Sequence, residues 1–433
     1  MDIIIKNARL PSQLKDQAEL WRIQIKNGLI DAVLPEAAAP DFTGQNVPQI
    51  DAAGNLVTPP FLEPHLHLDS ALSVGQPRYN ESSTLLEGIA IWGERKAKLT
   101  REEIVKNAIE AVLWEFANGT QFIRTHADVT HPSLLTLEAL LEVKEAVREL
   151  VDIQIVAFPQ DGVFTSPKAE KQLEEALRRG ADVVGGIPHI EFTREDGVRQ
   201  IELVFKLAQK YDALVDVHCD ETGDDQSRFL EVLLKEAIVT GLGPRATASH
   251  TTAFHNYNND YALKLTGIAA RAGANFIVNP FANAVLQNRT DGYPRRRGVT
   301  RVDELDAAGV NVSIGHDCIM DPWYPIGTGS LLQAANLLMH LGHLSGHAQI
   351  PRLFEMISAN TAITMQVEER YGIAPGKPAN LLVLDAKSPA EAIRLMPVCL
   401  YNIRHGKVAM TGQAARREIN FAGFVRNIDF KLD

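Results

Sequence analysis

The chain has 433 residues, of which 45% are hydrophobic and 22% are charged, and its net charge is −11. This composition is typical of soluble globular proteins, and the length allows one large domain and a smaller one. The negative charge argues against a nucleic-acid-binding surface. No apolar run reaches the roughly 18 residues that a membrane span requires.

The cysteines and the N-terminus bear on the cellular compartment. Cys219, Cys318 and Cys399 are far apart and form no C-x-x-C pair. A disulfide framework and a thiolate zinc site are therefore not expected, and a reducing compartment fits best. The opening MDIIIKNARL lacks the basic and apolar regions of a secretory signal. We expect a cytoplasmic protein.

Both ends of the chain show the pattern of a small β domain. MDIIIKNARL and residues 21–34 alternate with period 2, and the second segment contains KNG, a hairpin signal. Residues 379–385 and 401–412, at the other end of the chain, have a similar β pattern. We predict that 1–57 and 373–433 form one small β-sandwich, built from both termini, and that 58–372 form a separate domain between them.

The middle of the chain alternates between short apolar, β-rich segments and amphipathic, helix-like ones. The predicted strands are 56–68, 121–129, 153–160, 182–190, 213–221, 245–252, 275–280 and 311–318. Residues 99–119 read as a helix with Thr100 as its cap and Gly119 as its stop, and 166–180 read alike. Eight such alternations predict an α/β fold, a (β/α)8 TIM-like barrel.

The stretch FLEPHLHLDS places His65 and His67 two residues apart in the first predicted strand. Side chains two residues apart in a strand point to the same side, where two imidazoles can bind one metal ion. Such a pair also arises by chance in a chain with 13 histidines. The prediction therefore depends on partners from other strands.

Polar residues gather at the C-terminal ends of the predicted strands, where barrel enzymes have their active sites. In chain order they are His65, His67, Gln160, His218, Glu221, His250 and Asp317. Three His and one Asp would provide four ligands for Zn²⁺ or Fe²⁺ and leave room for a water. The strand containing GIPHI has no lysine to carry a bridging carbamate, so we expect one divalent metal ion.

Other polar residues leave two interpretations open. His126 in RTHAD could support the site or be a hydrogen-bonded core residue. The helical spacing of His340, His343 and His347 imitates a metal site, but no acid lies among them, so a structural or exposed role is expected. The basic YPRRRG at 293–298 is expected to be a solvated loop or a subunit contact.

EPHLHLD, VAFPQ, DVHCDE, TASHTT and GHDCIMDPWYP together resemble the bacterial cytosine deaminases of the amidohydrolase superfamily, and the resemblance covers most of the chain. It implies a metal-dependent (β/α)8 barrel with a small β-sandwich, usually in an oligomer. By position, the implied site comprises the metal ligands His65, His67, His218 and Asp317, the proton shuttle Glu221, the water-orienting His250, the base-reading Gln160, and the pocket walls Leu85 and Trp323.

The chemistry of these residue types agrees with deamination of cytosine. The reaction needs hydroxide attack at C4 and protons at N3 and on the departing amine. Asp317 can take the proton of the water, and Glu221 can pass a proton to N3 and then to the amine. The unrelated zinc deaminases that use a C-x-x-C motif are excluded, because this chain has none.

One position departs from the family pattern. The family usually has a second Asp directly after the metal-binding Asp, near C5 of the base, and here that residue is Cys318. A thiol is uncharged and behaves as a small hydrophobe, so a 5-methyl group would fit beside it. We therefore predict that 5-methylcytosine, giving thymine and ammonia, is accepted at least as well as cytosine. In the alternative, Cys318 merely fills space and cytosine is preferred.

Three other functions stay open. The chain could deaminate another heterocycle of the isoguanine or pterin type, hydrolyse a cyclic amide or chlorinated ring, or bind metal without catalysis. Glu221, three residues after His218, favours deamination, and the presence of His250 and Asp317 argues against lost catalysis. The expected partners are a small pyrimidine base and further copies of the chain, without nucleic acid or membrane.

Overall fold

The centre of the molecule is an eight-stranded parallel sheet. The computed structural model describes residues 2–11, 19–40, 47–131, 133–166 and 168–431. Each strand pairs with the next along the chain, in the order β13-β12-β11-β10-β9-β8-β7-β6. The strands are β6 (Phe61–Leu66), β7 (Thr120–Asp128), β8 (Asp152–Phe158), β9 (Val183–Gly186), β10 (Leu214–Cys219), β11 (Ala246–His250), β12 (Asn275–Val278) and β13 (Val312–Ile314). The predicted (β/α)8 barrel is confirmed.

The barrel closes between its first and last strands at their C-terminal ends. The N–H of His67 donates to the carbonyl of Asp317 over 3.0 Å, and the N–H of Asp317 donates to the carbonyl of His65 over 2.9 Å. Leu66 forms a parallel bridge with Asp317. The seam of the barrel is therefore made by the segments that carry three of the predicted site residues.

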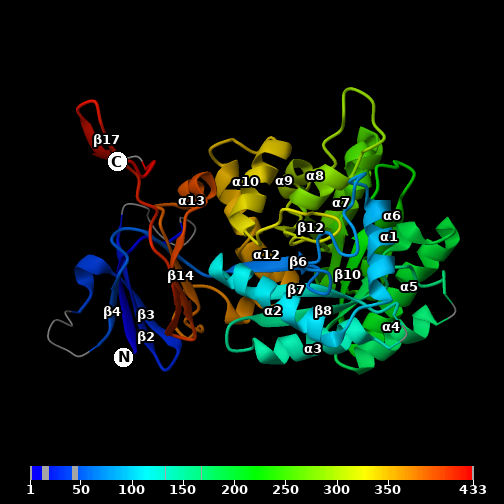
Figure 1. Ribbon diagram of the computed structural model, residues 1–433, viewed down its shortest axis with the longest axis horizontal. Coiled ribbons are helices and arrows are strands. Elements are labelled where there is room, and N and C mark those ends of the chain that lie inside the picture. Colours follow the sequence, from blue (N-terminus) through cyan, green and yellow to red (C-terminus); the bar gives the residue numbers. More distant parts are fainter. Residues whose placement is uncertain (1, 12–18, 41–46, 132, 167, 432–433) are drawn as a thin grey trace.

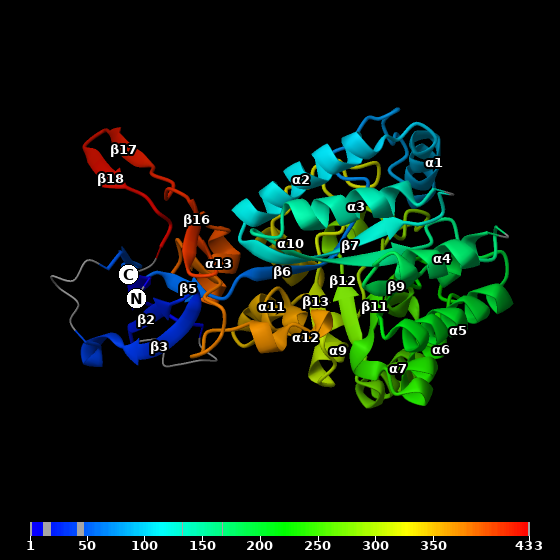
Figure 2. The same cartoon turned by 90° about the horizontal axis from the view of Figure 1, so that it is seen from below.

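Helices surround this sheet (Figures 1 and 2). Thr100 caps α2 by accepting the N–H of Glu103, and Gly119 follows that helix with a φ of 100°, as the caps in the sequence predict. The helices of this part are α1 (Leu85–Lys96), α2 (Arg101–Ala117), α3 (Leu135–Ala146), α4 (Ala169–Arg178), α5 (Arg194–Tyr211), α6 (Phe229–Thr240), α7 (Asn259–Ala272), α8 (Pro280–Leu286), α9 (Val302–Ala307), α10 (Leu331–Leu341), α11 (Gln349–Met356) and α12 (Ala359–Met365).

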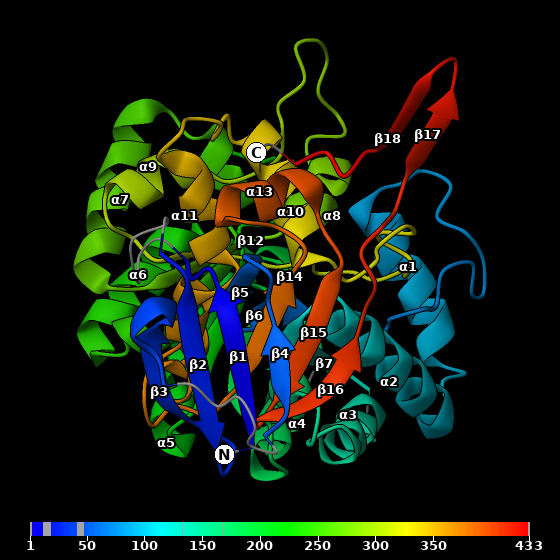
Figure 3. The same cartoon turned by 90° about the vertical axis from the view of Figure 1, so that its left-hand side faces the viewer.

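Two four-stranded sheets from the chain ends pack into a small β-sandwich beside the barrel (Figure 3). One contains β3 (Leu29–Pro35), β2 (Trp21–Lys26), β1 (Ile3–Ala8) and β4 (Gln49–Asp51), and the other β16 (Lys407–Thr411), β15 (Cys399–Arg404), β14 (Leu381–Leu384) and β5 (Leu56–Thr58). Residues of both sheets, among them Ile23 and Val383, share one apolar core. The domain boundaries at 57/58 and 372/373 stay a prediction.

Two predicted strands are wrong in their extent. The segment 56–68 is two strands, because β5 pairs with β14 in the sandwich and β6 begins the barrel. Pro59 and Pro60 lie between them, and proline lacks the N–H that a sheet needs. The segment 182–190 leaves the sheet after Gly186 and continues as the short 3₁₀ helix η2 (Pro188–Ile190).

The sequence interpretation missed one helix and one hairpin near the C-terminus. Helix α13 (Pro389–Leu395) follows β14, and a two-stranded hairpin of β17 (Glu418–Phe421) and β18 (Phe424–Asn427) extends away from the body (Figure 2). All residues of the two hairpin strands are exposed. Over the described part of the chain, no helix combines the length and apolarity needed to cross a membrane.

Candidate active site

One cavity at the C-terminal end of the barrel brings together the residues that the sequence singled out. The space within it, counted together with its open mouth, is about 380 Å³. It is lined by His67, Leu85, Ile89, Gln160, Ile187, His218, Glu221, His250, Leu286, Asp317, Cys318 and Trp323. Ile89, Ile187 and Leu286 were not predicted, since aliphatic residues carry no chemical signal, and Leu85 was named only because of the family resemblance.

Four side chains lie close together at this cavity, and three of them, His67, His218 and Asp317, line it. The Nε2 atoms of His65 and His67 each lie 3.6 Å from Oδ1 of Asp317. Nε2 of His67 lies 3.2 Å from Nε2 of His218. Ligands at about 2.0–2.2 Å from a tetrahedral ion are themselves roughly 3.3–3.6 Å apart. The three measured distances are therefore compatible with binding of one metal ion.

The state of these side chains also fits a divalent metal ion. Nε2 of His65 is buried and forms no hydrogen bond with any described residue. Burial lowers the pKa of His65 and of His218 well below the ordinary value, so both rings are neutral, which is the form that binds metal. Imidazole nitrogen and carboxylate oxygen suit Zn²⁺ or Fe²⁺ and do not decide between them.

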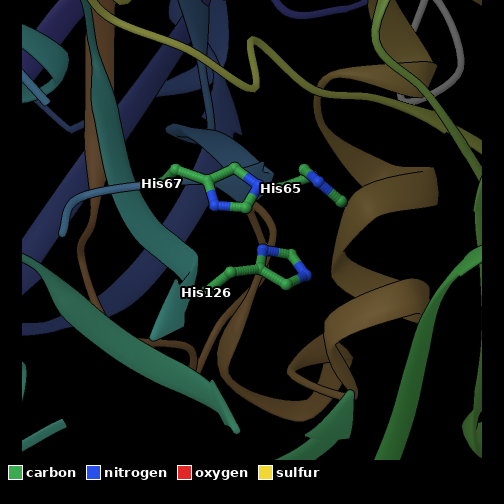
Figure 4. Close-up of side chains that lie close together, drawn as sticks. All are labelled: His65, His67 and His126. Carbon is green, nitrogen blue, oxygen red and sulfur yellow. The ribbon is translucent and has the colours of Figure 1, made fainter. Parts of the chain in front are cut away.

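His126, whose role the sequence left open, lies beneath His65 and His67 (Figure 4). Its ring centre is 4.1 Å from that of His65 and 4.9 Å from that of His67. Its Nδ1 lies 3.4 Å from the carbonyl oxygen of Leu66. Potential ligand atoms of His65, His67 and His126 all lie within 4.8 Å of one another. The same holds for those of His65, His218 and His250. His126 is thus a buried residue that packs on the site, close enough to His65 and His67 to count among the potential ligands.

Glu221 and His250 form the side of the cavity next to Asp317. Oε1 of Glu221 accepts a hydrogen bond from Nε2 of Gln287 over 3.3 Å and lies 3.7 Å from Nδ1 of His250. That Nδ1 lies 2.9 Å from Nδ2 of Asn283. Burial and, next, the Asp317 carboxylate raise the pKa of Glu221 well above its ordinary value. The raised pKa favours the protonated form of Glu221.

The backbone at the cavity rim adopts uncommon conformations. The φ angle is 67° at His250, 45° at Thr251 and 73° at Asp317. Residues other than glycine adopt such angles at a cost, and they gather at functional sites, where the surrounding structure holds them. The turns after β11 and β13 thus direct two site residues into the cavity.

Glu63, which the sequence interpretation missed, joins the first and last strands below the ligands. Its Oε1 accepts the N–H of His65 over 2.8 Å, and its Oε2 accepts the N–H of His316, 253 residues away, over 2.9 Å. A Cβ at Gly315 would lie 2.5 Å from Oδ1 of Asn279 and 3.0 Å from Oε1 of Glu63. A glycine is therefore required where this carboxylate crosses the seam.

Cys318 and Trp323 form one wall of the cavity. Burial and, next, the carboxylates of Asp317 and Asp321 raise the pKa of the Cys318 thiol well above its ordinary value, so it is neutral. Oδ1 of Asp321 accepts the N–H groups of Trp323 and Tyr324, both over 2.9 Å, which fixes the loop that carries the indole. This wall therefore has an apolar character.

The remaining polar clusters lie elsewhere. His340, His343 and His347 are exposed, and His340 lies in the last turn of α10, which ends at the cap residue Gly342. Residues 292–297, which include most of YPRRRG, are exposed as well. None of these residues lines the cavity described above.

Comparisons with known proteins agree with this geometry. The sequence profile of the Amidohydrolase family matches residues 49–411. N-isopropylammelide isopropyl amidohydrolase of Pseudomonas sp. (strain ADP) is 30% identical over 417 residues, 94% of this chain and 96% of that protein. Pterin deaminase of Rhizobium rhizogenes is 26% identical, over 92% of this chain and 90% of that protein. The crystal structure of 5-methylcytosine deaminase from Klebsiella pneumoniae liganded with phosphonocytosine is 45% identical, with a TM-score of 0.92, and covers 96% of this chain and 99% of that chain.

Proposed function

The chain belongs to the amidohydrolase family, and on that premise we propose that it is a metal-dependent aminohydrolase of a free cytosine-type base that accepts 5-methylcytosine. The observation that carries this proposal is one cavity lined by His67, His218, Glu221, Asp317 and Cys318. The 45% identity to a 5-methylcytosine deaminase over 96% of this chain supports it.

In this proposal His65, His67, His218 and Asp317 hold one divalent ion, Zn²⁺ or Fe²⁺. When bound, such an ion lowers the pKa of a water to about 7 and so supplies a hydroxide nucleophile at neutral pH. The protein provides the ligand spacing and a buried environment, since all four side chains are at most one-tenth exposed.

The proton transfers fall to Asp317, Glu221 and His250. Asp317 accepts the proton that the attacking water gives up. Glu221 donates its proton to N3 of the base as C4 is attacked, then takes up the proton of the new C4 hydroxyl and passes it to the amine so that ammonia leaves. The proton held by Asp317 finally restores Glu221. His250, next to both carboxylates, orients the water. Water is consumed, the C4–N bond breaks and a carbonyl forms at C4, giving thymine from 5-methylcytosine.

The base itself is bound by the rest of the cavity. The Gln160 amide can donate to the carbonyl oxygen of the pyrimidine and accept from a ring N–H. Leu85 and Trp323 enclose the flat faces of the ring and exclude water. Cys318 lies where a substituent at C5 would point, and its sulfur packs against a methyl group more favourably than a carboxylate would.

Ammonia release from metal-replete protein tests the proposal. The panel comprises cytosine, 5-methylcytosine, isoguanine, a pterin and a cyclic amide, with metal-depleted protein as the control. We expect 5-methylcytosine to be deaminated with a kcat/KM at least equal to that of cytosine. Turnover of the pterin or the isoguanine without turnover of either pyrimidine would replace the proposed substrate, and ring opening without ammonia would replace the reaction.

We also propose that the chain forms a homo-oligomer in the cytoplasm. The support is the hairpin β17–β18, on which Phe421, Phe424 and Val425 are 81%, 70% and 72% exposed. Isolated two-stranded hairpins are marginally stable in water, so a partner that covers these residues is expected. Light scattering of the purified protein would reveal a mass above that of one 47.6 kDa chain.

A further inference from the structure

A buried ion pair lies inside the barrel below the proposed metal ligands. Nη1 of Arg124, on β7, is 3.1 Å from Oδ2 of Asp216, on β10, and both side chains have an exposure of 0%. The interior layers of such barrels are usually filled by branched apolar side chains. Moving two charges out of water is costly, and well-packed apolar residues are often at least as stabilising. The pair therefore calls for a functional explanation.

Arg124 is held in place by three further groups. Its Nε donates to Oε1 of Gln154 over 3.1 Å, its Nη2 donates to the carbonyl of Thr364 over 2.9 Å, and its Nη1 also lies 3.4 Å from Oγ1 of Thr247. The guanidinium cannot lose its charge in a protein. It consequently keeps a positive charge beside Asp216, and this charge opposes the rise that burial causes in the pKa of that carboxyl.

Ser249 connects this carboxylate to His65. The Ser249 hydroxyl donates to Oδ1 of Asp216 over 2.6 Å. Its Oγ lies 3.1 Å from Nδ1 of His65. A serine has a single hydroxyl proton, and here that proton is directed to Asp216, so toward His65 the oxygen can only accept. Nδ1 of His65 must then carry the ring proton.

The tautomer that follows leaves Nε2 of His65 with a free lone pair. That atom is buried, hydrogen-bonds to none of the described residues, and faces Oδ1 of Asp317 at 3.6 Å. Which nitrogen of a histidine binds metal is set by the hydrogen bond that the other nitrogen makes. The chain of contacts thus ends on the atom that the proposed metal site needs.

We propose that Asp216 and Ser249 are positioning residues that fix His65 in the tautomer with the proton on Nδ1, so that Nε2 is ready to bind the metal ion. The inference rests on the proposed function only through the assignment of His65 as a ligand. Arg124 stabilises the carboxylate from which the arrangement starts. The buried ion pair thereby acts on metal binding through one serine.

Substitution of Ser249 in the full-length protein tests this role. Ser249→Ala removes the acceptor for Nδ1–H, and we expect the Zn²⁺ dissociation constant, measured by competition with a chelator, to rise by about 10–100-fold. The absorption spectrum of the Co²⁺-loaded protein should change, since the His65 ring is no longer held. Ser249→Thr keeps the hydroxyl and should restore both properties.

Ser313→Ala provides the matched control. Ser313 is also a fully buried serine on a barrel strand, and its Oγ lies 2.8 Å from Oγ1 of Thr364. Its substitution should lower thermal stability to a similar degree while it leaves the Zn²⁺ affinity and the Co²⁺ spectrum unchanged. Equal losses of affinity in the two alanine variants would show a general packing effect and would overturn the proposal.

A measurement on the parent protein makes the test independent of whether the variants fold. Protein with ¹⁵N-labelled histidine, freed of metal, is examined by long-range ¹H–¹⁵N NMR, and the His65 signals are assigned by their loss in His65→Gln. We expect a protonated Nδ1 and an unprotonated Nε2. The opposite tautomer would refute the proposal. Neither experiment uses turnover, so both outcomes are separate from the fate of the proposed substrate.

Discussion

Gly88 of α1 controls how far the indole of Trp323 lies from the proposed base. A Cβ at this position would be 2.4 Å from Cδ1 and 2.5 Å from Nε1 of Trp323. Carbon atoms in contact are about 3.5–4.0 Å apart, so Gly88→Ala requires a displacement of roughly 1 Å or more. The helix is anchored beside this point, because Ile91 and Trp92, one turn further along the same face, are fully buried. The indole must therefore move.

The structure indicates where the indole can go. Trp323 lies between the base cavity and a second cavity lined by Tyr79 and Ile326 among others. Leu85 and Ile89, which flank Gly88 on the helix, line the base cavity, so an indole pushed off the helix narrows that cavity. A misplacement of about 1 Å in an active site can cost up to roughly 100-fold in rate. We expect a loss of this order in kcat/KM for both cytosine and 5-methylcytosine.

Gly93→Ala on the same helix is the matched control. Gly93 is exposed, and no atom of the described chain lies within 4 Å of a Cβ placed there. This change should leave the kinetics unaltered and stabilise the protein by about 0.4–1 kcal/mol, because alanine restricts the unfolded chain. Ammonia release and thermal melting measure both effects. A Gly88→Ala enzyme with parental kcat/KM would refute the argument that Trp323 forms the cavity wall.

Three further predictions concern the proposed site. Glu221→Gln should keep the fold and the metal but lower turnover by about 10²–10⁴-fold, since an amide cannot carry the proton; near-parental turnover in a fully metallated variant would exclude that role. Metal analysis should find one divalent ion per chain, and His65→Ala combined with His218→Ala should remove it, whereas retained metal would place the site elsewhere. Cys318→Asp should reduce kcat/KM for 5-methylcytosine relative to cytosine by about 10–200-fold, and an unchanged ratio would show that position 318 does not set specificity.

The sequence predicted the barrel strands and the residues at their ends because both leave strong local patterns. Period-2 and apolar runs mark strands, and His, Glu or Asp directly after a buried strand is unusual enough to notice. The failures occurred where local pattern and tertiary pairing differ. Residues 56–58 and 61–66 look like one apolar run, yet the first pairs with β14 and the second begins the barrel.

Other parts of the site could not be predicted, or were overlooked. Arg124, His126 and Asp128 alternate along one predicted strand, so a polar interior face was visible in the sequence. Asp216 pairs with Arg124, and Ser249 donates to Asp216. Both residues come from other strands, and only the closed barrel shows these contacts. The role of a glycine such as Gly88 depends on a side chain more than two hundred residues away.

The seam between β6 and β13 also determines at which stage of folding the site forms. Glu63 and His316, 253 residues apart, are joined across it, and the backbones of His65 and His67 pair there with Asp317. Contacts of such long range form late, because the intervening chain must first be ordered. During synthesis, a chain that lacks its eighth barrel strand also lacks a complete ligand set. If the four proposed ligands hold the ion, metal acquisition is tied to completion of the barrel, and incomplete or partly folded chains have no assembled site with which to hold it.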